Sequence, residues 1–217
     1  MLPENKIALL QLANDVNLQA PQQEMAAHYV ELIETWNRHT NLVSRQDIGR
    51  LVSRHLRESF WFCLPQVLGE ATRVLDLGSG AGFPGVPMKI LQGALRLTLL
   101  DSRQRKALFL AEVVRSMGWR DVEVCCDRAE NLPVRAPGMR FELVVCRAVS
   151  CLTELWRWAE PLLQPGGRLA ALKGGNLAPE VNRLKMKRPA LEVQWHAMPQ
   201  LTDDPTADRT MILIHKF

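Results

Sequence analysis

The 217-residue sequence lacks several features that would assign it to a particular class of protein. No apolar run is long enough to cross a bilayer, and the opening residues lack the basic-then-apolar order of a secretory signal. The five cysteines form no Cys-x-x-Cys pair, and their odd number argues against a complete set of disulfides. These absences predict a cytoplasmic protein with reduced thiols and no membrane-spanning segment.

Metal-binding and repeat signatures are missing too. His39 and His55 lack the spacing and the acidic neighbours of a metal pair, so we expect no metal. The net charge of +4 is too small to establish nucleic-acid binding, although arginine outnumbers lysine and its planar guanidinium suits phosphate. The length fits one domain with, at most, a small accessory lobe.

The most informative stretch is residues 73–85, which read Arg-Val-Leu-Asp-Leu-Gly-Ser-Gly-Ala-Gly-Phe-Pro-Gly. The apolar start indicates a buried strand, and the glycines indicate a tight turn that opens a helix, with Pro84 or Pro87 in its first turn. Glycines let the backbone fold back sharply and let a ligand approach the main chain closely. The unpaired N–H groups of the helix start then face whatever occupies the turn.

Three interpretations of this turn compete. Gly80, Gly82 and Gly85 match the dinucleotide-binding pattern Gly-x-Gly-x-x-Gly, with Asp101 ending the next apolar run. However, Asp76 stands before the glycines, where a carboxylate would repel a pyrophosphate but suits the cationic groups of S-adenosylmethionine (AdoMet). A plain turn without a ligand rarely needs four glycines. A methyltransferase is therefore favoured over an NAD-linked oxidoreductase.

Residues 1–70 have a helical texture. Ile7, Leu10 and Leu12 suggest a first amphipathic helix, and Pro21 opens a second whose apolar residues recur at helical spacing. A third helical stretch spans about residues 48–64, where basic residues lie among aromatic and aliphatic ones. Basic side chains beside aromatic ones, here at residues 50–57, are typical of an RNA-contact surface and also of a helix with a solvated outer face.

From residue 73 onward, strand-like runs and helices alternate, which predicts a parallel sheet with crossover helices. The expected strands are residues 74–77, 95–100, 122–126, 141–146 and 169–172, with 191–198 and 209–216 as an antiparallel edge. Ser102 is placed to cap the helix after the second strand. The helix after the fourth strand is expected to place Leu152, Leu155 and Trp158 on its apolar face.

Ligands of open parallel sheets bind at the carboxyl ends of the strands. The candidates are therefore the residues that follow each strand: the turn 76–85, Asp101, residues 127–130, Arg147 and Lys173. Asp101 is placed to accept hydrogen bonds from a ribose, and the loop after the third strand is placed to meet an adenine. Cys146 stands near the end of the fourth strand but lacks the adjacent proline of a cytosine-C5 methyltransferase nucleophile.

Three sequence motifs follow one another along the chain: Asp-Leu-Gly-Ser-Gly-Ala-Gly-Phe-Pro-Gly at 76–85, Leu-Leu-Asp-Ser at 99–102 and Arg-Lys-Ala-Leu-Phe-Leu at 105–110. Together they resemble the ribosomal RNA small subunit methyltransferase G family, also called glucose-inhibited division protein B. The resemblance covers nearly the whole chain, and the Gly-Phe-Pro-Gly ending is its specific part. One departure is Glu58, where the family usually has an aspartate.

The resemblance implies an α/β fold of the class I AdoMet-dependent methyltransferase (Rossmann-like) type. Its mostly parallel seven-stranded sheet with flanking helices would occupy residues 71–217, and residues 1–70 would form an N-terminal helical extension. The implied reaction moves a methyl group from AdoMet to N7 of a guanine in the decoding-region loop of small-subunit ribosomal RNA. The implied partner is that RNA or the small ribosomal subunit, and we expect a monomer.

Carried over residue by residue, the family's cofactor contacts fall on Gly78, Phe83, Ala129, Glu130 and Arg147. The motif and strand-end arguments add Asp76, Gly80 and Asp101.

Guanine N7 carries a free lone pair, so its methylation requires no base to remove a proton. Arg147 and Lys173 are instead expected to hold the phosphate of the target nucleotide or to donate to guanine O6. Basic faces at 50–57 and 185–188 are expected to bind rRNA phosphates. Other acceptors, namely another RNA, a protein or a small molecule, and a non-catalytic role on the ribosome remain as alternatives.

Overall fold

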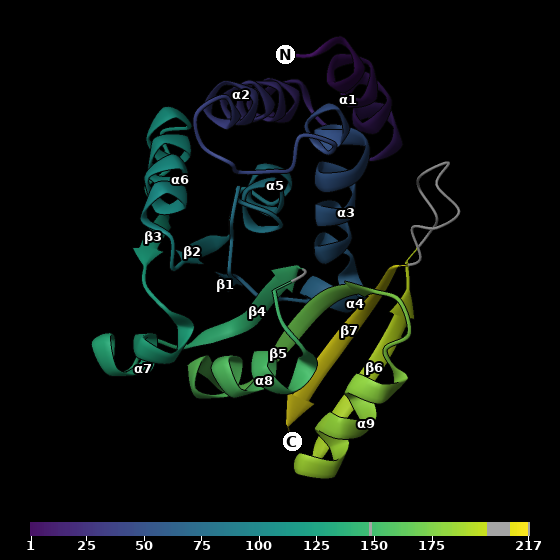
Figure 1. The fold of residues 1–217 in the computed structure, drawn as a ribbon, viewed down its shortest axis with the longest axis vertical. Coiled ribbons are helices and arrows are strands. Elements are labelled where there is room, and N and C mark those ends of the chain that lie inside the picture. The colour runs from purple at the N-terminus through teal and green to yellow at the C-terminus, as the bar shows by residue number, and fades with distance from the viewer. Residues whose placement is uncertain (148, 199–208, 217) are drawn as a thin grey trace.

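A seven-stranded sheet forms the centre of the protein, as the computed structural model shows for residues 1–147, 149–198 and 209–216 (Figure 1). The strand order is β3-β2-β1-β4-β5-β7-β6, and the first five are parallel. β7 runs antiparallel between β5 and β6. The strands are β1 (Arg73–Leu77), β2 (Arg96–Asp101), β3 (Val122–Cys126), β4 (Phe141–Arg147), β5 (Leu163–Gly174), β6 (Leu191–Ala197) and β7 (Arg209–Lys216). The expected α/β fold with a mostly parallel sheet is confirmed.

Helices cover both faces of this sheet (Figure 1). α7 (Leu132–Arg135), α8 (Leu152–Ala159) and α9 (Ala178–Lys187) lie on one face. The other face carries α1 (Pro3–Asp15), α2 (Ala20–Asn37), α3 (Arg57–Phe60), α4 (Pro65–Leu68), α5 (Gly85–Leu91) and α6 (Gln104–Ser116). Successive strand residues alternate between the two resulting cores: Val74 and Leu99 pack into one, Leu75 and Leu100 into the other.

The N-terminal seventy residues share a core with the sheet. Leu12, Tyr29 and Leu56 are completely buried in the same apolar cluster as β1 and β2 residues. The change from helices to alternating strands and helices does fall near residue 70, at the start of β1. Packing, however, continues across that point, so the extension and the sheet domain are joined through one core.

The segment 48–64 is helical as expected, but it is not a regular α-helix. It contains a 3₁₀ turn at Ile48–Arg50, a π-helical stretch at Leu51–Leu56, α3, and a second 3₁₀ turn at Trp61–Cys63. π-helical turns are rare and are frequently found at functional sites. This one contains His55, whose buried side chain belongs to the site described below.

Three local expectations are wrong, and a fourth is right in part. In α1 the buried residues include Leu9 and Leu12, whereas Ile7 and Leu10 are about 60% exposed. In α8 Trp158 is half-buried and packs against the core as expected, but the tryptophan that is buried is Trp156. Ser102 does not cap α6; the backbone N–H of Arg103 donates to the Asp101 carboxylate instead. The fifth strand begins at Leu163, well before residue 169, with a register irregularity against β4.

The expected antiparallel pair is confirmed, with one difference of position. β6 and β7 pair antiparallel, but only β6 lies at the edge, because β7 also pairs with β5.

Candidate active site

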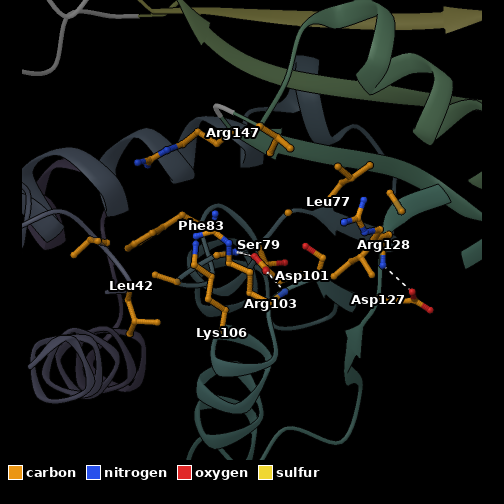
Figure 2. A pocket seen from close by; sticks show the side chains of 18 of the residues that line it. Leu42, Leu77, Ser79, Phe83, Asp101, Arg103, Lys106, Asp127, Arg128 and Arg147 are labelled. Atoms are coloured by element: carbon orange, nitrogen blue, oxygen red, sulfur yellow. Dashed lines mark hydrogen bonds between the residues drawn. The ribbon is translucent and has the colours of Figure 1, made fainter. Parts of the chain in front are cut away.

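A cavity of about 610 Å³ opens at the carboxyl ends of the parallel strands. Figure 2 shows Arg147 at the end of β4 above Phe83, with Asp127 and Arg128 at one side of the cavity and Leu42 at the other. A volume of this size suits a cofactor or another small molecule. Its lining residues come from the ends of the first four parallel strands, from the segments that follow them and from the N-terminal segment: Leu42, Val43, Ser44, Asp47, His55, Leu77–Ala81, Phe83, Leu100–Arg103, Lys106, Asp127–Glu130, Arg147, Val149 and Trp158.

The glycine turn forms the floor of this cavity. Gly78 and Gly80 have positive φ angles of 76° and 61°, a conformation that glycine adopts without strain. The N–H of Gly80 donates to the Asp101 carboxylate (2.9 Å), which joins the turn to the end of β2. At Gly82, a Cβ atom would stand 2.8 Å from the Tyr29 hydroxyl, so a side chain there would displace α2. The glycines are therefore required by packing on one side and leave the backbone accessible on the other.

Asp76 is bonded to the glycine turn on the side that faces the protein core, and it does not line the cavity. Its side chain is completely buried, and Oδ2 accepts the N–H of Gly85 (2.9 Å) at the start of α5. Oδ1 has no hydrogen-bond partner among the described residues. Burial raises the pKa of Asp76 to about 7, although the Gly85 N–H opposes this shift. The expected direct contact with a cationic ligand is not what this geometry shows; the carboxylate instead fixes the turn to the helix.

Three side chains from distant parts of the chain stack at one end of the cavity. The His55 ring lies on the Phe83 ring with centroids 5.1 Å apart, and the Arg147 guanidinium lies 5.4 Å from the Phe83 centroid. Arg147 also contacts His55 Nδ1 and donates to the His55 carbonyl (3.3 Å). Burial, and then the charge of Arg147, lowers the pKa of His55 to about 3, so the imidazole is neutral.

Glu58 gathers three arginines beside this stack. Its carboxylate is 3% exposed and lies 3.1 Å from Arg209 Nε, 3.4 Å from Arg147 Nη1 and 3.7 Å from Arg54 Nε. Burial lowers the pKa of Arg147, and Glu58 is the main group that opposes this shift. Glu58 therefore offsets the cost of burying Arg147 and fixes the direction of its side chain. The Glu58 carboxylate thus has a definite role in the site.

A second cavity of about 440 Å³ adjoins the first, since Arg147 and Val149 line both. Its other lining residues are Arg54, Glu58, Ser150, Cys151, Leu172, Lys173, Gly174, Glu180 and Arg209. Lys173 Nζ donates to the carbonyl of Ser150 (2.7 Å) and to Glu180 Oε2 (2.6 Å). Four cationic and two anionic side chains line this cavity, which suits an electron-rich or anionic ligand.

Most residues expected from the sequence come together here. Gly78, Gly80, Phe83, Asp101, Ala129, Glu130 and Arg147 line the first cavity, and Lys173 lines the second. Cys146 lines neither; it is completely buried, and burial raises the pKa of its thiol to about 12, which excludes a nucleophilic thiolate. Lys106, Trp158 and Glu180 also line the cavities, although the sequence did not single them out as site residues. Lys106 could have been predicted from the sequence, because it lies in the first turn of the helix that follows Asp101.

The two basic faces differ. Arg54 pairs with Asp47 (2.9 Å) and Arg57 pairs with Asp15 (2.7 Å), so nearby carboxylates neutralise much of the face at 50–57. Lys185 and Lys187 of α9 are exposed. The face at 185–188 is therefore the stronger candidate for phosphate contacts.

Residues 1–147, 149–198 and 209–216 contain neither a metal-binding cluster nor a membrane-spanning helix. Within these ranges, no group of three or more histidine, cysteine, aspartate or glutamate side chains is placed to hold a metal ion. No helix in the same ranges has the length and apolar character needed to cross a membrane.

Comparison with known proteins matches residues 22–211 to the family model described as rRNA small subunit methyltransferase G. The protein of that name from Laribacter hongkongensis is 39% identical over 189 residues, which cover 82% of this chain and 88% of that one. The Roseiflexus castenholzii protein of the same name is 35% identical over 212 residues, 96% of this chain and 90% of that one. The Mycobacterium leprae relative, at 38% identity, is longer, and the alignment spans 65% of it.

Solved structures support the fold. An rRNA methylase from Streptococcus thermophilus superimposes with a TM-score of 0.54 at 18% identity, covering 76% of this chain and 97% of that one.

Proposed function

Because this chain belongs to the rRNA small subunit methyltransferase G family, we propose that its two cavities bind AdoMet and a guanine of small-subunit rRNA, whose N7 it methylates. In the family the target is guanine 527 of 16S rRNA. The observation that carries the proposal is the pair of adjoining cavities at the strand ends, with Arg147 and Val149 shared between them.

The residues of the first cavity fit AdoMet. The backbone of Gly78 and Gly80 offers close approach, Asp101 lies at the end of β2 for a ribose, and Ala129 with Glu130 lies at the end of β3 for the adenine. Asp76 acts through the turn, by holding Gly85 and with it the start of α5. When bound, AdoMet supplies a methyl group whose carbon–sulfur bond breaks as the N7 lone pair forms the new bond, so the positive charge passes to the purine.

The chain's own task is to align the two reactants. No proton has to leave N7, so no general base is required, and alignment alone can supply roughly 7–11 kcal/mol of the barrier. Arg147 and Val149, which line both cavities, form the wall between them, and Phe83 and His55 stack against Arg147 on the side of the first cavity. Neutral His55 and the Glu58 carboxylate limit the positive charge that the purine meets at this wall.

We further propose that the partner is the small ribosomal subunit or its RNA, which places the enzyme in the cytoplasm. We also propose that the protein acts as a monomer.

The test is transfer of labelled methyl from AdoMet to small subunits and to protein-free rRNA, both lacking the modification. Label at one guanine, mapped by chain cleavage at N7-methylguanine, is the expected result. Arg147→Ala should reduce transfer by two orders of magnitude or more, since a small misplacement of reactants costs roughly 100-fold. Unchanged transfer by Arg147→Ala would exclude its place at the wall, and AdoMet binding without any transfer to rRNA would redirect the search to another acceptor.

A further inference from the structure

The ion pair between Lys173 and Glu180 is the most specific feature of the second cavity. Lys173 is 13% exposed and uses two of its three N–H donors, on the Ser150 carbonyl and on Glu180 Oε2. Glu180 Oε2 also accepts the N–H of Leu152, at the start of α8. Its other oxygen, Oε1, makes no hydrogen bond to the described part of the chain. One donor and one acceptor, fixed side by side, thus remain for a ligand.

We propose that this pair reads the Watson–Crick edge of the target guanine, with Lys173 donating to O6 and Glu180 Oε1 accepting from N1–H and the 2-amino group. The inference deepens the proposed function and rests on it. The Watson–Crick edge of guanine presents an acceptor, O6, beside two donors, N1–H and the 2-amino group. Uracil shares the first acceptor and donor but has a carbonyl in place of the second donor. Adenine presents a donor followed by an acceptor, which would set like groups against Lys173 and Glu180. Bases removed from a helix are commonly recognised through this edge.

A phosphate is a poorer occupant of the same position. The accepting Glu180 Oε1 would face a phosphate oxygen, and two anionic acceptors repel one another. The arginines that line the same cavity, Arg54, Arg147 and Arg209, remain as the groups suited to a phosphate.

The orientation of the base follows from its covalent structure. N1 and N7 lie on opposite sides of the carbonyl at C6, so a guanine held through N1–H turns its N7 away from Glu180. Arg147 and Val149 line both cavities and so mark the border where the second meets the first. Holding the Watson–Crick edge at Lys173 and Glu180 thus turns N7 away from the ion pair, and we place it toward that border.

The Glu180 carboxylate is also expected to increase the rate of methyl transfer. Methylation at N7 leaves a positive charge on the purine, which strengthens the N1–H bond to an anionic acceptor. An interaction that grows in the transition state raises kcat, whereas one of constant strength lowers KM. Glu180 is therefore expected to contribute to kcat and to base selectivity together.

The test uses small subunits reconstituted with ligated rRNA that carries guanosine or inosine, which lacks the 2-amino group, at the target position. Wild-type protein should prefer guanosine by about tenfold or more in kcat/KM, since one hydrogen bond to a charged acceptor is lost. Glu180→Gln keeps an acceptor for the Leu152 N–H, and it should lower kcat by about tenfold and reduce the preference for guanosine. AdoMet affinity, measured by calorimetry, should stay within twofold.

The matched control is Glu112→Gln. Glu112 has the same kind of ion pair, 2.6 Å from Arg115, and nearly the same exposure (29% against 30% for Glu180), but it lies on α6 away from the second cavity. The base-reading role would be overturned if Glu180→Gln kept the full preference for guanosine. It would also be overturned if the wild type methylated both RNAs equally well. In either case the proposed methyltransferase function would stand. A wild-type protein that binds AdoMet but methylates neither RNA would overturn the proposed function, and the base reading with it.

Discussion

Two buried carboxylates, Asp76 and Glu58, have opposite surroundings. Asp76 accepts the N–H of Gly85 and forms no ion pair with the described residues, and burial raises its pKa to about 7. Glu58 lies among three arginines. Burial without a charged partner disfavours the ionised form of a carboxylate. Burial beside several cations makes the ionised carboxylate necessary for the stability of the folded state. Replacement by the neutral amide should therefore have opposite effects at these two positions.

Asp76→Asn should stabilise the ligand-free protein near neutral pH. The folded-state pKa of about 7 exceeds the unfolded value of about 3.9, so between these values the folded chain holds a proton that the unfolded chain has released. Wild-type stability therefore falls as pH rises through this window, and the advantage of the variant should grow by up to about 1.4 kcal/mol per pH unit. Urea unfolding at pH 5 and pH 7.5 measures this; a difference that is independent of pH would contradict it.

Glu58→Gln should destabilise the protein by about 3 kcal/mol, because three arginines lose their shared carboxylate. Methyl transfer should fall as well, since Arg147 loses its partner at the wall between the cavities. Glu58→Asp, which keeps the negative charge, should retain more stability than Glu58→Gln. Chemical unfolding and single-turnover methylation report the two effects. Equal stability of the two variants would argue against a role for the charge.

At the scale of elements, α2 is fastened to the glycine turn by one hydrogen bond. The buried Tyr29 hydroxyl donates to the carbonyl of Ala81 (2.6 Å), and the Tyr29 ring packs edge-on against Phe83. Tyr29→Phe keeps the ring and removes the bond. It should lower stability by roughly 1–3 kcal/mol, because a buried carbonyl is left unpaired, and weaken AdoMet binding. Calorimetry measures both; full AdoMet affinity would show that the turn holds its shape without α2.

The strands could be predicted more accurately than the helix faces, for a physical reason. Strands buried on both sides, such as β1 and β2, are short apolar runs bounded by polar or glycine residues, and such runs are distinctive. On α1, apolar residues occur on more than one side, so spacing alone selected Ile7 and Leu10 over Leu9. The π-helical turn at Leu51–Leu56 depends on packing around His55, for which the local sequence carries no signal.

At the scale of the whole molecule, the net charge of +4 is modest, and its distribution decides where RNA binds. We expect Lys185→Ala with Lys187→Ala to weaken binding to small-subunit rRNA and to reduce the salt dependence of log K by about one unit per lysine. Arg57→Ala is the control, because its guanidinium already pairs with Asp15. Filter binding over a range of salt concentrations provides the measurement. A larger effect of the control would move the contact to the N-terminal segment.

The strand ends predicted the first cavity because topology alone brings them to one edge of the sheet. The second cavity could not be predicted in the same way. Glu58, Glu180 and Arg209 come from a helical segment before the sheet, from α9 and from β7, and only tertiary packing places them together. Lys173 was selected as a strand end, but its partner Glu180 belongs to the following helix.

The pair of Glu58 and Arg209 joins positions 151 residues apart. During synthesis, Glu58 and its neighbouring arginines leave the ribosome long before β7 is made, so their charges first meet water. The wall between the cavities can reach its final form only when nearly the whole chain has emerged. A chain that ends before β7 therefore lacks both the Arg209 partner of Glu58 and the strand that lies between β5 and β6, and with them the finished site.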